Sequence, residues 1–320
     1  MLIENVVKSE MLGKIRIKEK VTQYVYDGQD LITDDQKKRF NENDDTTTDE
    51  SNGTIDRGQI NDDDQLLMNG TSIDDKLQLD QKLEIYWVNV ITFALLHVAA
   101  LYAIYVGVTQ AKLLTLPYMY LVGQLTSFGF SCGAHRLWTH RSYKAKAPLQ
   151  YILAFLFMMS FQHNLYKWCR NHRVHHRYSD TDADPHNIRR GLFFAHIGWL
   201  MCQSHPRVLE ARTKVYLDDL DWDPVVQFER RYHMTLGPIV WGVLPVLIPY
   251  YVWGESLWAA WFTCVIYRYV VTLNLAWSIN SLAHVYGNKP YDKHIMATES
   301  PINHVLMGES YHNYHHTFPW

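Results

Sequence analysis

Three histidine-rich runs in this chain have the residue type and spacing for metal chemistry. On a helix, positions i, i+3 and i+4 share one face, so an HxxHH run would aim three imidazoles in one direction. A single HxxH pair is weak support for a site, because a lone histidine is usually solvated or satisfied in a core. Three runs in one chain predict a joint metal site. They are box one with His135 and His140, box two with His172, His175 and His176, and box three with His312, His315 and His316.

The number of box histidines bears on how many metals the site holds. Imidazole suits zinc, copper, iron or nickel, and the ligand type alone does not choose among them. The boxes offer eight histidines, which exceeds what one tetrahedral zinc needs, so we expect two metals. His135 and His140 are five residues apart and do not share a face of a regular helix. If both bind metal, a helix end or bend must lie between them.

Four residues outside the ligand pattern also bear on the site. Asn280 and His284 stand at i and i+4 just beyond a long apolar run, and would point together toward the boxes. From spacing alone, an interfacial histidine without a ligand role is an equal reading of His284. Arg136 and Arg173 lie inside the boxes, and we expect them to position acidic or phosphate groups rather than to touch metal.

Composition divides the chain into two regions. From residue 1 to 84 acids outnumber bases, aromatics are few and no periodicity is sustained, which predicts a disordered acidic segment. Residues 85–320 are aromatic-rich and mildly basic, and neither region indicates nucleic acid binding. Four cysteines without CxxC spacing give no support to a disulfide framework and fit reduced surroundings. A charged and polar stretch precedes the first apolar run, so a cleavable signal is not expected.

Apolar runs predict the fold class. Four of them are long enough to cross a bilayer: residues 85–107, 114–134, 235–253 and 257–279. Residues 149–161 are apolar but too short to cross, and we expect a buried or interfacial helix there. The prediction is therefore an all-α membrane protein with four transmembrane helices and a helical cap, formed by residues 135–234 and 280–320, that carries the histidine site.

The topology follows from the histidines. If the boxes share one site, they must face one side of the membrane, and the count closes with four spans and both termini on that side. Basic residues agree, because Arg141, Lys144 and Lys146 follow the second span and Arg230 precedes the third, whereas the opposite loops offer little beyond Lys112. By the positive-inside rule, the boxes and both termini are cytosolic.

The order and spacing of the motifs resemble a known family. HRLWTH, HRVHH and HNYHH, together with NSLAH from Asn280 and SDTDADPHN from Ser179, are similar to the membrane acyl-CoA desaturases, in particular the stearoyl-CoA desaturase type of animals and insects. The resemblance runs from about residue 86 to 320 and does not include residues 1–84. It implies a multi-pass enzyme of the endoplasmic reticulum that uses O2 and electrons from cytochrome b5 to insert a cis double bond, at delta-9, into a saturated acyl-CoA.

The resemblance also implies the cofactor and its ligands. In the family two iron ions are bound by the box histidines and by the histidine of NSLAH, here His284, with Asn280 acting through a water. This set differs from the carboxylate-rich di-iron bundles, in which Glu-x-x-His pairs dominate. Breaking an unactivated methylene C–H bond requires a redox cofactor, because protein side chains supply no such oxidant.

Substrate residues are carried over singly from the resemblance. Asn89, Arg170 and Trp277 match family positions that hold the coenzyme A head or the start of the acyl chain, and Asn171 stands beside them where an aspartate is common. Plainer readings exist, since Asn89 could cap a helix, Arg170 could snorkel and Trp277 could anchor at the membrane interface. On the second span, the positions where the family sets chain length are Met119 and Gly123.

The chain departs from the family at several positions. Gln203 and Ser204 replace a basic pair that meets the coenzyme A phosphates, Ser310 replaces a glycine ahead of box three, and the chain ends at Trp320 where relatives continue. These departures leave an inactive paralogue as an alternative. A related membrane lipid hydroxylase or desaturase would keep the histidine boxes but change the product, and HRLWTH together with NSLAH argues against it. A metal carrier is disfavoured, because transporters place ionisable residues within their spans.

Overall fold

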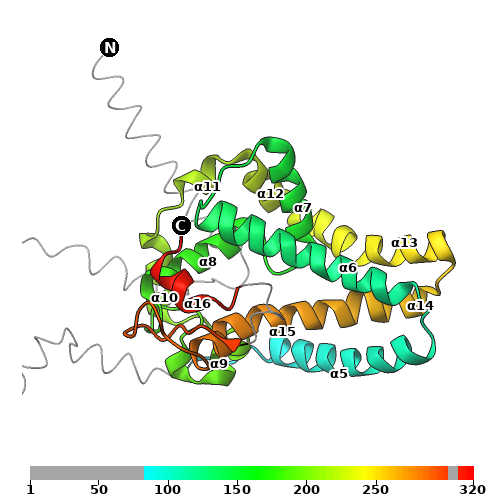
Figure 1. Cartoon of the computed structure of the whole chain (residues 1–320), viewed down its shortest axis with the longest axis horizontal. Helices are drawn as coiled ribbons and strands as arrows, with labels where there is room; N and C mark the ends of the chain where they lie inside the picture. The colour runs from blue at the N-terminus through cyan, green and yellow to red at the C-terminus, as the bar shows by residue number, and fades with distance from the viewer. Residues whose placement is uncertain (1–82, 302–308) are drawn as a thin grey trace, which may run out of the picture. The chain divides into compact units, whose positions relative to one another are not determined.

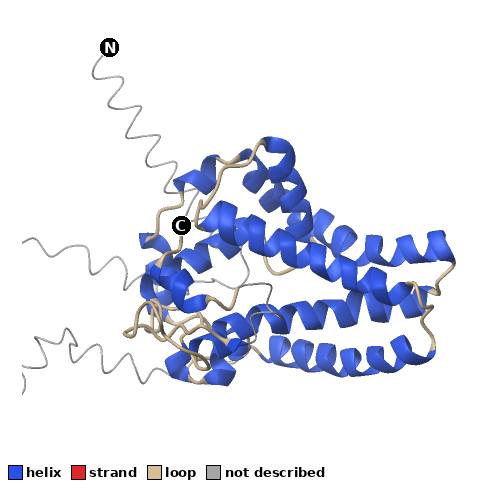
Figure 2. Ribbon diagram, viewed as in Figure 1, coloured by secondary structure: helices blue, strands red, loops and turns tan. Residues whose placement is uncertain are grey.

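The structure is a computed structural model that describes residues 83–301 and 309–320. The predicted disordered segment 1–84 lies outside the described residues, except for Leu83 and Glu84. The described part is helical, and its only β-pairing consists of isolated bridges, such as the one between Ile85 and Cys202 (Figure 2). The all-α prediction is confirmed for this part of the chain.

Four continuous helical segments run through the long axis of the described part (Figure 1). Helices α5 and α6 belong to the first two, and α12, α13 and α15 to the others. Three of the segments contain a π-helix, in which each backbone N–H bonds five residues back. The segments are α5 (Trp87–Thr109); α6 (Thr115–Phe128) with η1 (Gly129–Thr139); α12 (Pro224–Pro238), η4 (Ile239–Val243) and α13 (Leu244–Trp253); and α14 (Leu257–Ala260), η5 (Trp261–Tyr267), α15 (Arg268–Ser281) and η6 (Leu282–His284).

Three of these segments, within the described residues, are long and apolar enough to cross a membrane: Trp87–Thr109, Pro224–Trp253 and Leu257–His284. They coincide with three of the four predicted spans. The fourth prediction, residues 114–134, falls on α6 and η1, which are helical but do not reach the same apolar content. The four-span arrangement therefore stays a prediction.

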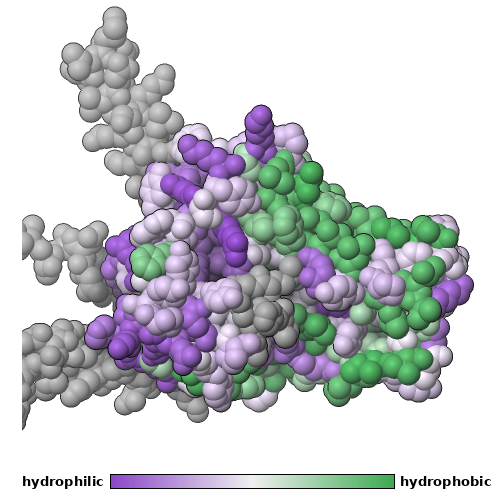
Figure 3. Space-filling view, in the orientation of Figure 1, coloured by the Kyte–Doolittle hydropathy of each residue, from purple (hydrophilic) through white to green (hydrophobic). Residues whose placement is uncertain are grey.

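Apolar side chains cover the outside of the spans rather than being buried. On α5, Leu101 and Val108 are 69% and 81% exposed, and hydrophobic surface gathers over α5, α7 and α13 in Figure 3. A helix that is apolar all round requires an apolar environment on every face. Its outer face is therefore suited to lipid.

Shorter helices build the polar end of the described part. Residues 149–161, predicted not to cross, form α7 (Ala147–Met158), and box two lies on α8 (Leu165–Tyr178). Boxes one, two and three all lie at this end, whereas the turns after α5 and α13 meet at the other (Figure 1). There the Lys112 ammonium donates to the carbonyls of Trp253 (2.9 Å) and Gly254 (2.6 Å). The remaining short elements are η2 (Ile188–Arg190), α9 (Leu192–His196), η3 (Gly198–Leu200), α10 (Pro206–Lys214), α11 (Asp218–Trp222) and α16 (His312–Thr317).

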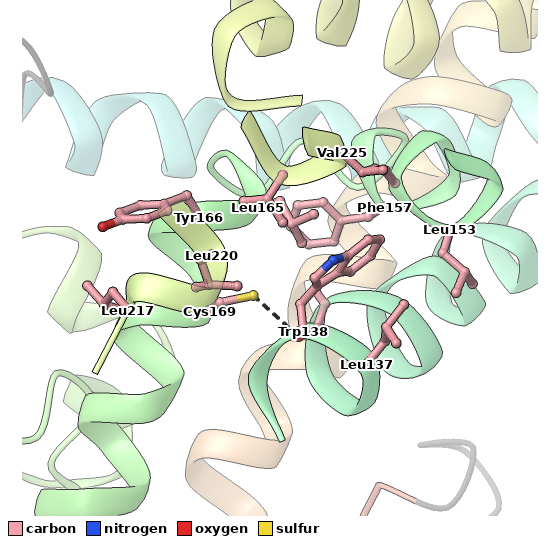
Figure 4. Packing of buried hydrophobic residues seen from close by; sticks show 13 residues of the cluster. Leu137, Trp138, Leu153, Phe157, Leu165, Tyr166, Cys169, Leu217, Leu220 and Val225 are labelled. Carbon is pink, nitrogen blue, oxygen red and sulfur yellow. Dashed lines mark hydrogen bonds between the residues drawn. The ribbon is translucent and has the colours of Figure 1, made fainter. Parts of the chain in front are cut away.

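A buried cluster fixes the helices that carry boxes one and two. Trp138 of η1, Phe157 of α7, and Leu165 and Cys169 of α8 meet in it, each less than a tenth exposed (Figure 4). The Cys169 thiol donates to the carbonyl of Ala134 at 3.4 Å, which joins α8 to η1. Because interiors are close-packed, this cluster holds the two boxes at a fixed separation.

Candidate metal centre

Box two lies on a regular α-helix. Asn164 caps the start of α8 by accepting a hydrogen bond from the Lys167 N–H at 2.8 Å, and the buried Glu229 carboxylate accepts one from the Leu165 N–H at 2.7 Å. Both acceptors satisfy donors that every helix start leaves free. With α8 fixed at its first turn, His172, His175 and His176 project from one side of its last two turns, as the spacing predicted.

Box one lies on the π-helix η1. The His140 N–H donates to the carbonyl of His135 at 3.1 Å, and the Thr139 hydroxyl donates to that of Ala134 at 2.8 Å. Both bonds reach back five residues, so the wide turn brings His135 and His140 onto one face. Their ring centroids are 4.8 Å apart. A helix end or bend was expected between them, and η1 does end at Thr139, with His140 as the residue that follows it; the π-helical turn itself was not predicted.

Box three lies on the short helix α16, which is held by a residue inside the box. Asn313 is fully buried, accepts hydrogen bonds from the N–H groups of Tyr291 (2.9 Å) and Asp292 (3.1 Å), and donates to the carbonyl of Ala297 (3.0 Å). These bonds tie α16 to the loop after η6. Spacing alone had given Asn313 no role.

The structure brings all nine histidines of the predicted set together in two groups. Within each group one nitrogen per residue lies within 4.8 Å of the others. The two groups share boxes two and three, because alternate histidines of each box face different groups. The five-histidine group is His135, His140, His172, His176 and His315, and the four-histidine group is His175, His284, His312 and His316.

Nitrogen spacings within the groups fit a shared metal. The Nε2 atoms of His135 and His176 each lie 2.9 Å from Nε2 of His315, and Nε2 of His284 and of His316 each lie 3.0 Å from Nε2 of His312. With metal–nitrogen bonds of about 2.1 Å, ligand nitrogens at right angles lie about 3.0 Å apart and tetrahedral ones about 3.4 Å. The observed spacings match ligands at right angles.

Burial keeps most of these imidazoles neutral. It lowers the pKa of His172, His176, His312 and His316 well below the ordinary value, and neighbouring imidazoles lower it further. Burial also lowers the pKa of His140 to about 2. Neutral imidazole is the form that binds metal. The Nε2 atoms of His140 and His175 are buried without a hydrogen-bond partner among the described residues, which fits nitrogens that ligate.

Asn280 and the two box arginines take the following places. Asn280 lies half-buried on the last turn of α15, four residues before His284, and its role through a water stays a prediction. Arg173 donates to both oxygens of Asp219 (2.7 and 2.6 Å), and Arg136 donates to Glu309 (3.2 Å). Both arginines position acidic groups, as expected.

Three carboxylates contact the histidines, and reasoning from spacing missed them. Nδ1 of His175 lies 2.9 Å from Asp184, Nδ1 of His284 lies 3.1 Å from Asp180, and Nδ1 of His135 lies 2.9 Å from Glu309. Burial raises the pKa of Asp184, but the His175 side chain and the N–H of His186 outweigh it and keep the pKa below its usual value. His135 and Arg136 similarly hold the pKa of Glu309 far below its usual value, against the effect of burial. Asp180 and Asp184 lie in the sequence SDTDADPHN, and Glu309 lies in GES. These two motifs were the signals in the sequence that could have revealed the carboxylates.

A cavity of about 60 Å³ lies between α6, η1 and α15, and reaches the centre at Glu309. Phe130, Leu275 and Ile279 supply apolar lining, and Gln124 and Thr272 are also part of the wall. The cavity therefore runs from the middle of the helices to the partner of His135.

Comparison with known proteins decides the family. The model of the family described as "Fatty acid desaturase" matches residues 111–320. This chain belongs to the fatty acid desaturase family. It is 50% identical over 238 residues to "Stearoyl-CoA desaturase 5" of Bos taurus, covering 74% of this chain and 71% of that protein. It is 46% identical to "Acyl-CoA Delta12-desaturase" of Acheta domesticus (77% and 69% covered) and 48% identical to its "Acyl-CoA Delta-9 desaturase" (74% and 66% covered).

Family membership makes the chain an oxidoreductase of fatty acid metabolism, and its candidate spans associate it with a membrane. The two histidine groups are compatible with a metal centre. Relatives named for delta-9 and for delta-12 desaturation are about equally similar to this chain. Similarity therefore does not indicate where the double bond is placed.

Two of the predicted substrate residues, Asn89 and Trp277, lie where the polar end of the described part meets α5 and α15. The Asn89 amide donates to the carbonyl of Leu200 at 2.7 Å. Trp277 is 3% exposed, with Phe93 edge-on to its ring at 5.5 Å between centroids. Asn89 therefore neither caps a helix by its side chain nor stands free, and Trp277 is buried rather than an exposed interface anchor.

The other two predicted substrate residues are buried on α8. Arg170 is 2% exposed, and Asn171 accepts a hydrogen bond from the Arg212 guanidinium at 3.0 Å. A snorkelling role for Arg170 is excluded by this burial. Asn171, at the position of the family's usual aspartate, thus remains connected to a cation.

The remaining predicted positions are accommodated without strain. Met119 and Gly123 lie half-buried on α6, on the side of Gln124 away from the histidines. Ser310 is buried and its carbonyl accepts from the Ser300 N–H at 3.0 Å, so the side chain at this usual glycine fits. Gln203 donates its N–H to the carbonyl of Glu84 at 2.8 Å, and Ser204 follows it half-buried before α10.

Proposed function

We propose that this protein desaturates a saturated long-chain fatty acyl-CoA, inserting a cis double bond with O2 as oxidant and electrons from cytochrome b5. The proposal includes the delta-9 position and two iron ions. The observation that carries it is the convergence of nine histidines into two adjoining groups beside a cavity that runs between the helices.

The donor set supports a redox metal rather than a structural one. The five imidazoles of one group exceed the four ligands of a tetrahedral zinc, and the four imidazoles of the other group equal that number. Iron bound there would activate O2 so that an unactivated methylene C–H bond can be broken. The nine histidines would hold the iron, and Asn280 is proposed to hold a water on the four-histidine group.

The chain's own residues would bind and orient the acyl chain. The cavity beginning at Gln124 is proposed to hold the acyl tail, with Met119 and Gly123 limiting its length at the end remote from the histidines. Asn89, Arg170, Asn171 and Trp277 are proposed to hold the head group and the start of the tail. Apolar lining at Leu275 and Ile279 would exclude water from the reacting carbons.

The membrane arrangement is part of the proposal. Four spans, with α6 and η1 as the second, would put the boxes and both termini on the cytosolic side of the endoplasmic reticulum. A glycosylation sequon placed in the exposed loop at Lys144 should stay unmodified, and one at Gly254 should accept sugar. Sugar at Lys144 would contradict this topology.

Expression in cells that lack their own desaturase tests the activity. New unsaturated fatty acids, identified by chromatography with the double bond located by mass spectrometry, are the expected result. Protein that is present with about two irons per chain but yields no unsaturated product would favour the inactive paralogue. Hydroxylated fatty acids would favour the related hydroxylase.

A further inference from the structure

In each histidine group, carboxylates contact the Nδ1 atoms of some of the imidazoles. The carboxylates of the two groups come from different parts of the chain. Asp180 and Asp184 lie in the loop after α8 and contact His284 and His175 of the four-histidine group. Glu309 lies just before α16 and contacts His135 of the five-histidine group. The described residues include no carboxylate within ion-pair distance of both groups.

Asp184 is fixed rigidly enough to orient a ring. One of its oxygens accepts from the His186 N–H at 2.9 Å, and the other accepts from the Asp180 N–H at 2.9 Å. The first oxygen also accepts from Nδ1 of His175. Because Nδ1 then carries the proton, Nε2 of His175 keeps its lone pair for a metal.

Asp180 and Glu309 have the same relation to their histidines. The second oxygen of Asp180 accepts from the Met296 N–H at 3.3 Å, which connects the loop after α8 to the loop after η6. Glu309 also accepts from the hydroxyl of Ser131 and from Arg136, and its side chain is 9% exposed. Each carboxylate is thus positioned by groups other than the histidine that it holds.

Asp182 lies between the two aspartates and lacks this relation. Its Oδ1 accepts from the Arg190 guanidinium at 2.8 Å and from the Asn187 amide at 3.4 Å. Asp182 therefore offers a control with the same residue type in the same loop.

We propose that Asp180, Asp184 and Glu309 are positioning residues that secure the two halves of the metal centre separately, the aspartates for the four-histidine group and the glutamate for the five-histidine group. A carboxylate behind a ligating imidazole fixes its tautomer and raises its basicity, and losing it typically costs about 10- to 100-fold in metal affinity. The inference rests on the proposed metal centre, but on neither the iron nor the substrate of the proposed function.

The test is a titration of the full, detergent-solubilised chain with Co²⁺ after metal removal by a chelator. Metal per chain is measured by elemental analysis, and the two groups are distinguished by visible absorption, because five and four imidazoles impose different coordination. We expect two Co²⁺ ions per chain in the wild-type protein. Asp180→Asn and Asp184→Asn should each weaken one Co²⁺ by about 10- to 100-fold, Glu309→Gln should weaken the other to a similar extent, and Asp182→Asn should weaken neither.

Three results would overturn the inference. They are equal weakening of both metals in every variant, unchanged affinity in all of them, and an Asp182→Asn variant that behaves like Asp184→Asn. Thermal unfolding of the metal-free variants identifies any that fail to fold, and Asp180→Asn and Glu309→Gln, on separate segments, then carry the test independently. Fewer than two Co²⁺ in the unchanged protein would count against the proposed centre itself, which separates the two failures.

Discussion

Boxes one and two supply histidines to the same group through different backbones. On α8, the i and i+4 positions His172 and His176 meet because an α-helix repeats nearly every four residues. On η1, His135 and His140 meet because a π-turn bonds five residues back. The site therefore depends on which face of its helix a histidine occupies rather than on one fixed spacing in the sequence.

The two helices also differ in how they pack. An added Cβ on Gly129 of η1 would lie 2.3 Å from the Phe157 backbone nitrogen, so η1 and α7 touch backbone to backbone there. By contrast, α8 contains no glycine and is fixed by side chains such as Asn164 and Arg173. Box one is thus placed by backbone contact with α7, whereas box two is placed by polar anchors together with the buried cluster at Leu165 and Cys169.

Replacing a proposed metal ligand in either box should have the largest effect. His176→Ala and His140→Ala should each reduce unsaturated product by more than about 100-fold, because losing a ligand costs more than losing a ligand's partner. Fatty acid chromatography of expressing cells, with metal content of the purified protein, measures this. The exposed His294→Ala is the control and should leave both unchanged. If His140→Ala keeps full activity while His176→Ala loses it, boxes one and two do not contribute equally to the site.

Packing of box one is tested by Gly129→Ala. The new methyl group would meet the Phe157 nitrogen at 2.3 Å and the Leu156 carbonyl carbon at 2.4 Å, and backbone atoms cannot yield as a side-chain end can. We expect a destabilisation of about 3 kcal/mol, at the upper end for overpacking, measured as a lower thermal unfolding midpoint in detergent. Gly242→Ala, in the π-helix η4, is the matched control, because its Cβ would meet Trp261 at an ordinary 3.6 Å. Equal destabilisation by Gly129→Ala and Gly242→Ala would show that the cost arises from a side chain in a π-helix, not from the close approach of η1 to α7.

Local patterns predicted the parts of the site that depend on local periodicity. The faces of boxes two and three follow from i, i+3 and i+4 spacing, whereas spacing left the role of His284 open and the family resemblance added it to the set. The structure places all nine histidines in the two groups. Two predicted spans, 85–107 and 257–279, agree with Trp87–Thr109 and Leu257–His284 to within five residues at each end. The span predicted at 235–253 ends where the structure places it, but its segment, Pro224–Trp253, begins 11 residues earlier. Residues 114–134 lie in α6 and η1 but are not among the segments long and apolar enough to cross a membrane, so this fourth span stays a prediction.

Features that depend on distant segments could not be predicted. The π-turn at His135 is stabilised by packing on α7 and by the Cys169 thiol, neither of which a local spacing reveals. Glu309 lies 174 positions from His135 in the sequence. Because the sequence gives no indication that the two residues meet, Glu309 would be interpreted as a solvated surface charge. Acidic partners of histidines are set by the tertiary fold.

Arg173 joins the two boxes and its loss should be intermediate in effect. It donates to the Trp138 carbonyl of box one at 2.6 Å and to both oxygens of Asp219, and its side chain is 13% exposed. Arg173→Lys cannot make this forked contact, and we expect a loss of about 2 kcal/mol by denaturant unfolding, below the cost of breaking a fully buried pair. Arg141 meets the same carboxylate but is 51% exposed, so Arg141→Lys should cost less than about 0.5 kcal/mol. Similar losses in both variants would assign the effect to Asp219 rather than to the link between boxes.

The smallest expected effect isolates the π-turn itself. The Ala134 carbonyl in this turn accepts a hydrogen bond from the Thr139 hydroxyl at 2.8 Å, and Thr139 is 6% exposed. Thr139→Val keeps the shape and removes that donor, so we expect a loss of about 1 kcal/mol, with the Cys169 thiol still donating to the carbonyl. Thr213→Val on α10 removes an exposed hydroxyl bond to the Glu210 carbonyl and should cost a few tenths of that. If Thr139→Val matches Thr213→Val, the hydroxyl does not stabilise the π-turn, and packing against α7 alone holds His135 and His140 on one face.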